Sequence, residues 1–126
     1  MVSLADVRRL ALTLPDTDVD ESGNRFSVKG TGFAWPYPEK VNPKRARVER
    51  LDNYVVRVAD EDNKQAMLVG EPEKYFTTDH YNGYPAILVR LPAVDPDELT
   101  ELITDAWRIQ APRALVKALD SASPPR

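Results

Sequence analysis

Two segments of the chain repeat apolar residues at the spacing of one helix face. The stripes comprise Leu4, Val7, Ala11 and Leu14 near the N-terminus, and Leu99, Leu102, Ile103 and Ala106 further along. Residues at this spacing lie side by side on an α-helix, so each stripe predicts an amphipathic helix that packs on a core. Ser3 with Asp6, and Asp95 with Glu98, have the spacing of capping boxes directly before the stripes. Pro15 ends the first helix.

Other segments alternate between apolar and polar residues, which is the pattern of strands. Residues 25–29 alternate, residues 33–35 continue the same alternation after a glycine-rich turn, and residues 36–38 stop it with two prolines. This pattern predicts a β-hairpin. Residues 53–59 alternate in the same way and predict another strand. Residues 86–91 are apolar on both faces, which is typical of a central strand.

Weaker signals fill the rest of the chain. They are a polar loop over 16–24, a charged connector or poorly formed edge strand over 39–50, a short helix over 60–69, a short strand over 75–77, a turn over 82–85 and a last helix between Pro112 and Leu119. This order of elements predicts an α+β fold, a two-layer domain with a mainly antiparallel sheet and helices packed on it. We expect a single domain over residues 1–120 and a frayed C-terminal tail over residues 121–126.

The composition excludes several classes of chemistry. Of the 126 residues, 42% are hydrophobic and 29% are charged, as in ordinary globular domains. The absence of cysteine and the single histidine exclude disulfide frameworks, cysteine nucleophiles, thiolate metal sites and paired-histidine metal sites. The five glycines form no phosphate-binding loop motif. No apolar run approaches the roughly 20 residues of a membrane span, and the first residues lack a signal-peptide pattern. We expect a cytoplasmic monomer without cofactor, metal or membrane contact.

Charge is distributed unevenly along the chain, although the net charge is only −3. Residues 25–58 carry +5 and residues 106–126 carry +3, whereas residues 59–105 carry −8. Cations neutralise phosphates and exposed aromatic rings stack on unpaired bases, so a basic segment beside aromatic residues is a candidate for nucleic-acid binding. The alternative is a solvated charged loop. The candidate residues are Trp35, Lys40, Lys44, Arg45, Arg47 and Arg50, with Arg113 and Lys117 on the last helix as an extension.

A second candidate group stands beside the predicted turn and comprises Thr77, His80, Tyr81 and Tyr84. General acid–base catalysis needs an imidazole that an orienting partner holds in place. Asp79, the neighbour of His80, would point to the opposite face of a strand, and no nucleophile lies nearby in the sequence. We therefore expect no enzyme. These residues either line a binding cleft or tie the turn to the sheet by hydrogen bonds.

A third pattern imitates the start of a calcium-binding loop. Asp16, Asp18 and Asp20 alternate as in the first positions of such a loop. The sixth position, which requires glycine, is Glu21, and the twelfth, which requires glutamate, is Ser27. We therefore interpret this segment as a polar loop with Asx turns and expect no metal site.

Several short blocks follow one another in a fixed order across residues 4–119. They read RFSV at 25–28, GFAW at 32–35, FTTDHYNGYP at 76–85, LVRL at 88–91, EL at 98–99 and AWR at 106–108, followed by Ala111 and Pro112. Together they resemble the YjbR/MmcQ-like family, and the block at 76–85 is the most specific of them. The resemblance implies a strongly bent antiparallel sheet with helices packed on it, in an arrangement similar to a double-wing DNA-binding motif.

Members of that family are commonly labelled DNA-binding, and the resemblance supplies no catalytic residues. A fold analogy alone does not establish a function. The leading hypothesis is a small binding module that contacts nucleic acid through the region 35–50. The alternative is a module that binds a protein or a small ligand in a cleft beside the His80 turn and has no nucleic-acid role.

Overall fold

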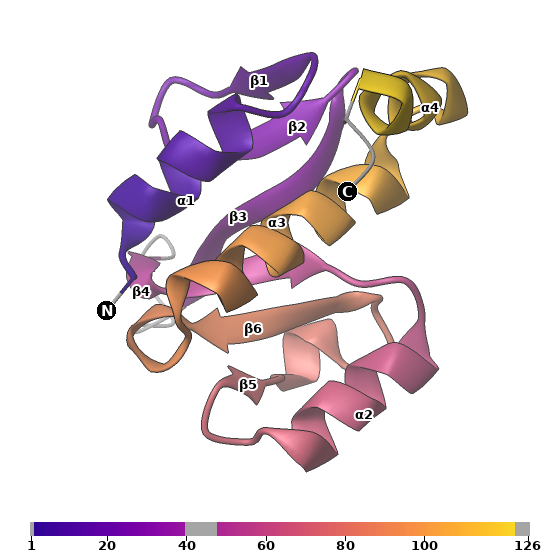
Figure 1. The fold of residues 1–126 in the computed structure, drawn as a ribbon. Helices are drawn as coiled ribbons and strands as arrows, with labels where there is room; N and C mark the ends of the chain where they lie inside the picture. The colour runs from indigo at the N-terminus through magenta and orange to yellow at the C-terminus, as the bar shows by residue number, and fades with distance from the viewer. Residues whose placement is uncertain (1, 40–47, 123–126) are drawn as a thin grey trace.

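The computed structural model describes residues 2–39 and 48–122, and this part of the chain forms four α-helices and one six-stranded sheet (Figure 1). Every strand pair is antiparallel. The strands lie in the order β1-β2-β3-β4-β6-β5. The predicted α+β class is therefore confirmed. In chain order the elements are α1 (Leu4–Leu12), β1 (Thr17–Val19), β2 (Phe26–Val28), β3 (Thr31–Glu39), β4 (Val48–Arg57), α2 (Glu61–Gly70), β5 (Tyr75–Phe76), the 3-10 turn η1 (Asp79–Tyr81), β6 (Ala86–Arg90), the 3-10 turn η2 (Leu91–Ala93), α3 (Pro96–Gln110) and α4 (Arg113–Ala122).

The main hydrophobic core lies between the sheet and two helices, α1 and α3. Both predicted apolar stripes take part in it, as expected. Trp107, which lies beside the second stripe, is fully buried, and its indole Nε1 donates a hydrogen bond to the carbonyl oxygen of Pro15 at 3.0 Å. The largest buried side chains of this core are Val7, Phe26, Val28, Phe33, Tyr54, Ile87, Leu91, Leu99, Ile103 and Trp107.

Three helices begin at capping residues, and the sequence predicts two of these caps, at Ser3 and Asp95. The Asp95 carboxylate accepts from the backbone N–H of Glu98 at 2.8 Å, and the Glu98 carboxylate accepts from the backbone N–H of Asp95 at 3.1 Å. Asp60 caps α2 by accepting from the backbone N–H of Asn63 at 2.9 Å. At α1, the backbone N–H of Ser3 donates to the Asp6 carboxylate at 2.9 Å, and this bond is the main reason that the pKa of Asp6 is lowered. None of the helices in the described ranges combines the length and apolar character needed to cross a bilayer.

The hairpin formed by β2 and β3 is present, but the expected alternation across it is wrong at one residue. Phe26 pairs with Ala34 while Ser27 pairs with Gly32, so Phe33 is an extra residue in β3. This β-bulge changes which face the following side chains occupy. Phe33 and Ala34 therefore both lie in the main core, whereas Trp35 lies against the smaller cluster of the other face.

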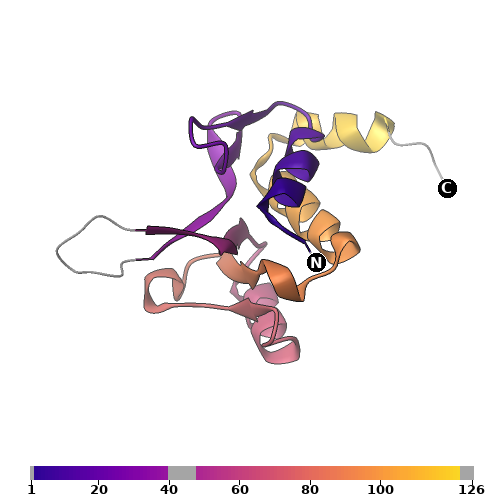
Figure 2. The same ribbon diagram turned by 90° about the vertical axis from the view of Figure 1, so that its left-hand side faces the viewer.

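The prolines of residues 36–38 do not end the hairpin strand, which continues to Glu39. Beyond Ala34, β3 pairs only with β4, so its other edge needs no ladder hydrogen bonds and tolerates residues without a backbone N–H. The pairing of β3 with β4 also jumps from Tyr54 to Arg50, which leaves residues 51–53 out of register. The arm made by the distal parts of both strands projects from the rest of the molecule (Figure 2).

The polar segment 16–24 contains a short strand that the sequence pattern did not predict. Strand β1 pairs with β2 over three residues, with Asp18 opposite Ser27. Its position at the sheet edge leaves Val19 41% exposed. Strand formation here depends on the partner β2 rather than on a buried apolar face, and therefore the alternation that marks the other strands is missing.

The second stripe yields a stability test, because two of its neighbouring residues differ in burial. Ile103 is fully buried, whereas Leu102 is only half-buried and lines a surface cleft. Replacing Ile103 with Ala should lower the free energy of unfolding by about 2–5 kcal/mol, the usual cost of a cavity in a core. Leu102→Ala should cost less than half as much. Urea denaturation of the two variants measures this difference, and equal losses would contradict the assigned orientation of α3.

Candidate functional site

The sheet face opposite the main core carries a smaller cluster rich in aromatic residues. Successive residues of β4 and β6 divide between the faces: Val56 and Ile87 lie in the main core, whereas Val55 and Leu88 lie in the smaller cluster. Three half-buried aromatic side chains pack against the smaller cluster. We define the aromatic face as Trp35, Tyr37, Phe76, Tyr81 and Tyr84.

One hydrogen bond joins the two regions that the sequence analysis treated as separate candidates. The indole Nε1 of Trp35 donates to the phenol oxygen of Tyr81 at 3.0 Å. The ring centroids of Tyr37 and Tyr81 lie 6.3 Å apart at an interplanar angle of 58°, and those of Tyr81 and Tyr84 lie 6.1 Å apart at 55°. Tilted pairs at this separation are favourable. The aromatic residue before the basic segment and the turn around residue 81 therefore form a single surface.

Two arginines lie over rings of the aromatic face, and sequence reasoning did not single them out. The guanidinium carbon of Arg57 lies 5.0 Å from the ring centroid of Tyr84, and that of Arg90 lies 4.3 Å from the ring centroid of Phe76. Both distances are within cation–π range. Arg90 also donates to the carbonyl oxygen of Pro72 at 2.9 Å. The sequence does contain a signal that could have identified Arg57. It follows Val55 by two residues, and residues two apart lie on the same face of a strand.

The turn that carries Tyr81 and Tyr84 is held by a fully buried lysine. The ammonium of Lys64, on α2, donates to the carbonyl oxygen of Tyr81 at 2.5 Å and to that of Tyr84 at 2.9 Å. Burial lowers the pKa of Lys64, and the charge of Glu61 opposes part of this effect. Among the described residues, no carboxylate forms an ion pair with this ammonium. A buried cation is costly without partners, so the carbonyl groups of the turn and Lys64 stabilise each other.

The strand that the sequence analysis assumed at Asp79 and His80 is absent, because residues 79–81 form the 3-10 turn η1. The side chain of His80 lies outside the described part of the structure. The hydroxyl of Thr77 lies 3.4 Å from the amide oxygen of Asn82, while the buried hydroxyl of Thr78 has no partner within the described ranges. Thr77, Tyr81 and Tyr84 thus lie together at one turn, as expected.

Most of the predicted basic segment falls outside the described residues. Lys40, Lys44, Arg45 and Arg47 belong to residues 40–47, and for Arg50 only the backbone is described. That backbone pairs with Tyr37 of the aromatic face. Residues 40–47 are therefore flanked by two strands, one of which contributes Trp35 and Tyr37 to the face.

The proposed extension of the basic segment, Arg113 and Lys117, lies at the other end of β3. Both side chains are exposed on α4. The helix before α4 is fixed beside the start of β3, because the side-chain amide of Gln110 donates to the carbonyl oxygen of Gly32 at 3.0 Å. From Gly32 to Glu39 an extended strand spans roughly 23 Å. Arg113 and Lys117 therefore lie on the helix that follows a contact at the start of β3, whereas the basic segment follows the end of this strand.

The three alternating aspartates do not share one loop. Asp16 pairs with Lys29 at 3.6 Å, Asp18 lies in β1, and Asp20 accepts from the hydroxyl of Ser22 at 2.6 Å. The bond from Ser22 is the largest cause of the lowered pKa of Asp20. Within residues 2–39 and 48–122, no group of three or more His, Asp or Glu side chains is placed to hold a metal ion.

The buried ammonium predicts a pH-dependent stability difference. Lys64→Met should lower the free energy of unfolding by about 1–3 kcal/mol at neutral pH, since two carbonyl groups lose their donor. The folded-state pKa of Lys64 lies below its ordinary value of 10.5, so at pH values between the two the unfolded chain binds more protons than the folded chain. Over this pH range the free energy of unfolding of the wild type therefore increases with pH through the titration of Lys64, and the variant lacks this increase.

Urea denaturation of wild type and Lys64→Met at about pH 7 and pH 9.5 measures this effect. The stability difference should be larger at the higher pH. A smaller stability difference at pH 9.5 than at pH 7 would mean that the folded protein stabilises the ammonium form of Lys64 more than the unfolded chain does, contrary to its buried position.

Comparison with known proteins places this architecture in a family. The family model named YjbR matches residues 12–109. Uncharacterized protein Mb2600 of Mycobacterium bovis and Uncharacterized protein Rv2570 of Mycobacterium tuberculosis are each 39% identical over 124 residues, which cover 94% of this chain and 95% of each relative. None of the solved structures matches the chain. The chain belongs to the YjbR family.

Proposed function

We propose that this protein is a small cytoplasmic module that binds single-stranded nucleic acid as a monomer, through the aromatic face and the basic segment beside it. The observation that carries the proposal is the surface joined by the Trp35–Tyr81 hydrogen bond. It combines half-exposed rings with arginines on a sheet face. Proteins that bind single strands without strong sequence preference use this combination, because every base has a ring face that can stack.

The exposed rings supply the stacking positions. Tyr84 is 41% exposed, and Trp35, Tyr37 and Phe76 are half-buried. A ring fixed on one side by packing and open on the other offers a base a pre-organised partner, which limits the entropy lost on binding. Arg57 lies over the Tyr84 ring, so its charge is held next to the surface on which a base would stack.

The charge distribution supports binding that is weak and sensitive to salt. Residues 25–58, which include β3, β4 and the basic segment, carry +5. Residues 59–105, which contribute Phe76, Tyr81 and Tyr84 to the same aromatic face, carry −8 and would oppose the approach of a polyanion. The attraction of phosphates therefore depends on the basic segment, and the opposing negative charge keeps the binding weak and sensitive to salt.

The salt dependence of binding tests the proposal. Each phosphate contact on a single strand releases counterions and contributes about −0.7 to the slope of log affinity against log salt. Replacing Lys44, Arg45 and Arg47 together with Ala should make this slope less steep by about two. Fluorescence anisotropy with a labelled oligothymidylate, measured at several salt concentrations, gives the slope.

A matched control removes cations at the far end of β3. Replacing Arg113 and Lys117 with Ala should leave the slope unchanged, because α4 follows a contact at the start of β3, whereas the basic segment follows the end of this strand. Tyr84→Ala should weaken binding while keeping the slope, since it removes stacking but no charge. Absence of binding at low salt would reject the nucleic-acid proposal and favour a protein or small-ligand site at the same turn.

A further inference from the structure

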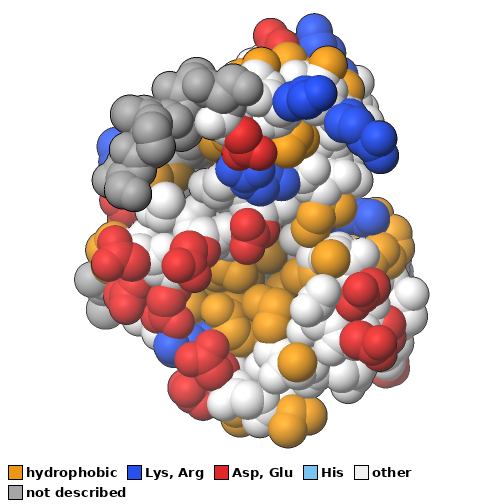
Figure 3. All heavy atoms as spheres, turned by 45° about the vertical axis from the view of Figure 1, so that its right-hand side comes forward, with side chains coloured by type: hydrophobic (Ala, Val, Ile, Leu, Met, Phe, Trp, Pro, Cys, Tyr) orange, Lys and Arg blue, Asp and Glu red, His pale blue; other side chains and the backbone are white. Residues whose placement is uncertain are grey.

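A cleft of about 610 Å³ lies between α2 and α3, and one of its lining residues is Arg57, which lies over the Tyr84 ring. Each helix turns one face toward it: Asn63, Ala66, Met67 and Gly70 recur at helical spacing on α2, as do Leu102, Asp105 and Ile109 on α3. Figure 3 shows the floor as a hollow of hydrophobic side chains. Ala66 is exposed, while Met67, Leu102 and Ile109 are half-buried, so the apolar surface is open to solvent.

Carboxylates flank this hollow on both sides (Figure 3). Glu101 and Asp105 are exposed one turn apart on α3, and Asp62 is exposed on α2 next to the lining residues. Within the described ranges, none of these three carboxylates makes a hydrogen bond or ion pair. The apolar cleft is therefore bordered by carboxylates that form no ion pair, although the charge of Arg108 attracts that of Asp105.

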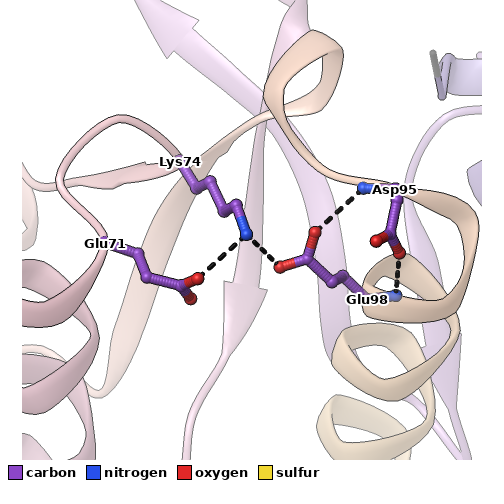
Figure 4. A network of polar contacts seen from close by, with 4 residues as sticks. All are labelled: Glu71, Lys74, Asp95 and Glu98. Carbon is purple, nitrogen blue, oxygen red and sulfur yellow. Dashed lines mark hydrogen bonds and ion pairs between the residues drawn. The ribbon is translucent and has the colours of Figure 1, made fainter.

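Arg108 and Glu71 of the lining have ion-pair partners, whereas Arg57 has a ring contact. Arg108 pairs with Asp120 at 2.5 Å, and Arg57 lies over the Tyr84 ring. Lys74 bridges Glu71 at 2.9 Å and Glu98 at 2.5 Å (Figure 4), and these bonds raise the pKa of Lys74. Among the described residues Arg57 forms no ion pair, so the charges left to act on a ligand are its guanidinium and the three flanking carboxylates, which outnumber it.

We propose that this cleft docks a basic amphipathic α-helix of a partner protein. Its apolar side chains would fill the hollow between α2 and α3, and its lysines or arginines would face Asp62, Glu101 and Asp105. The negative charge of the carboxylates favours a basic partner helix. An acidic helix would be repelled by them, and a purely apolar helix would leave them unpaired. The geometry is that of a helix held in a groove between two helices. α2 alone, with ten residues, offers a wall about 15 Å long.

The test uses the full chain labelled with ¹⁵N and two synthetic peptides. One is an amphipathic helix of leucine and lysine, and the other has every lysine replaced by glutamate. The lysine peptide should bind, with amide shifts concentrated in α2 and α3, while the glutamate peptide should bind at least about tenfold more weakly. Equal affinity for both peptides, no binding of the lysine peptide at low salt, or shifts concentrated elsewhere would each overturn the proposal.

Two substitutions distinguish binding in the cleft from nonspecific attraction of a basic peptide to an acidic protein. Ala66→Trp fills the hollow from an exposed helix position, and Asp105→Lys reverses one flanking charge. Each substitution should lower the affinity for the lysine peptide at least about tenfold. Asp18→Lys makes the same change of net charge on β1 and should leave the affinity within about twofold. An equal loss in the Asp18 variant would overturn the proposal.

Circular dichroism checks that each variant is folded. Gly70→Leu is a second filling variant should Ala66→Trp unfold, because a Cβ at Gly70 meets no atom within 4 Å. Unchanged affinity in a folded filling variant would also overturn the proposal. None of the substituted residues belongs to the aromatic face, so this result is independent of nucleic-acid binding.

Discussion

Strand β6 is buried on both of its faces, and this constraint organises the molecule. Ile87 and Val89 lie in the main core, whereas Ala86 and Leu88 lie in the smaller cluster. A strand of this kind needs cover on each side. Helices supply the cover on one face, and the turn η1 with its aromatic neighbours supplies it on the other. The aromatic face is therefore required by folding as well as suited to binding.

The position of the aromatic face is set by contacts between elements that are far apart in the sequence. Lys64 of α2 holds the carbonyl groups of residues 81 and 84, and the phenol of Tyr81 in turn accepts from Trp35. A buried ammonium with two acceptors tolerates little displacement, since either lost bond leaves a charge poorly solvated. Rings fixed in this way are pre-organised for a planar ligand, which links the buried polar contact to the proposed function.

The sequence allowed the main layers to be predicted, because their signals are local. The cap at Asp95 and the stripe from Leu99 to Ala106 predicted α3. The two apolar faces of residues 86–91 predicted a strand buried on both sides, although β6 lies next to the edge strand β5 and not at the centre of the sheet. Features that depend on pairing between distant segments were missed. The bulge at Phe33 and strand β1 arise from register with β2, which no local periodicity encodes.

The candidate site was predicted in pieces rather than as one surface. Trp35 was chosen for its basic neighbours, and Tyr81 for its turn, but the bond between them spans 46 positions. Lys64 was missed, because a lysine in a short polar helix has the same local pattern whether its ammonium is in water or buried against carbonyl groups. Its role follows only from the fold of residues 81–84.

The most direct measurement follows the two indole N–H resonances during titration with a single-stranded oligothymidylate at low salt. The chain has two tryptophans, and the indole of each donates a hydrogen bond, from Trp35 to Tyr81 on the aromatic face and from Trp107 to Pro15 in the main core. The account predicts a saturable shift of the Trp35 resonance and a stationary Trp107 resonance. A stationary Trp35 resonance, or equal shifts of both, would contradict it.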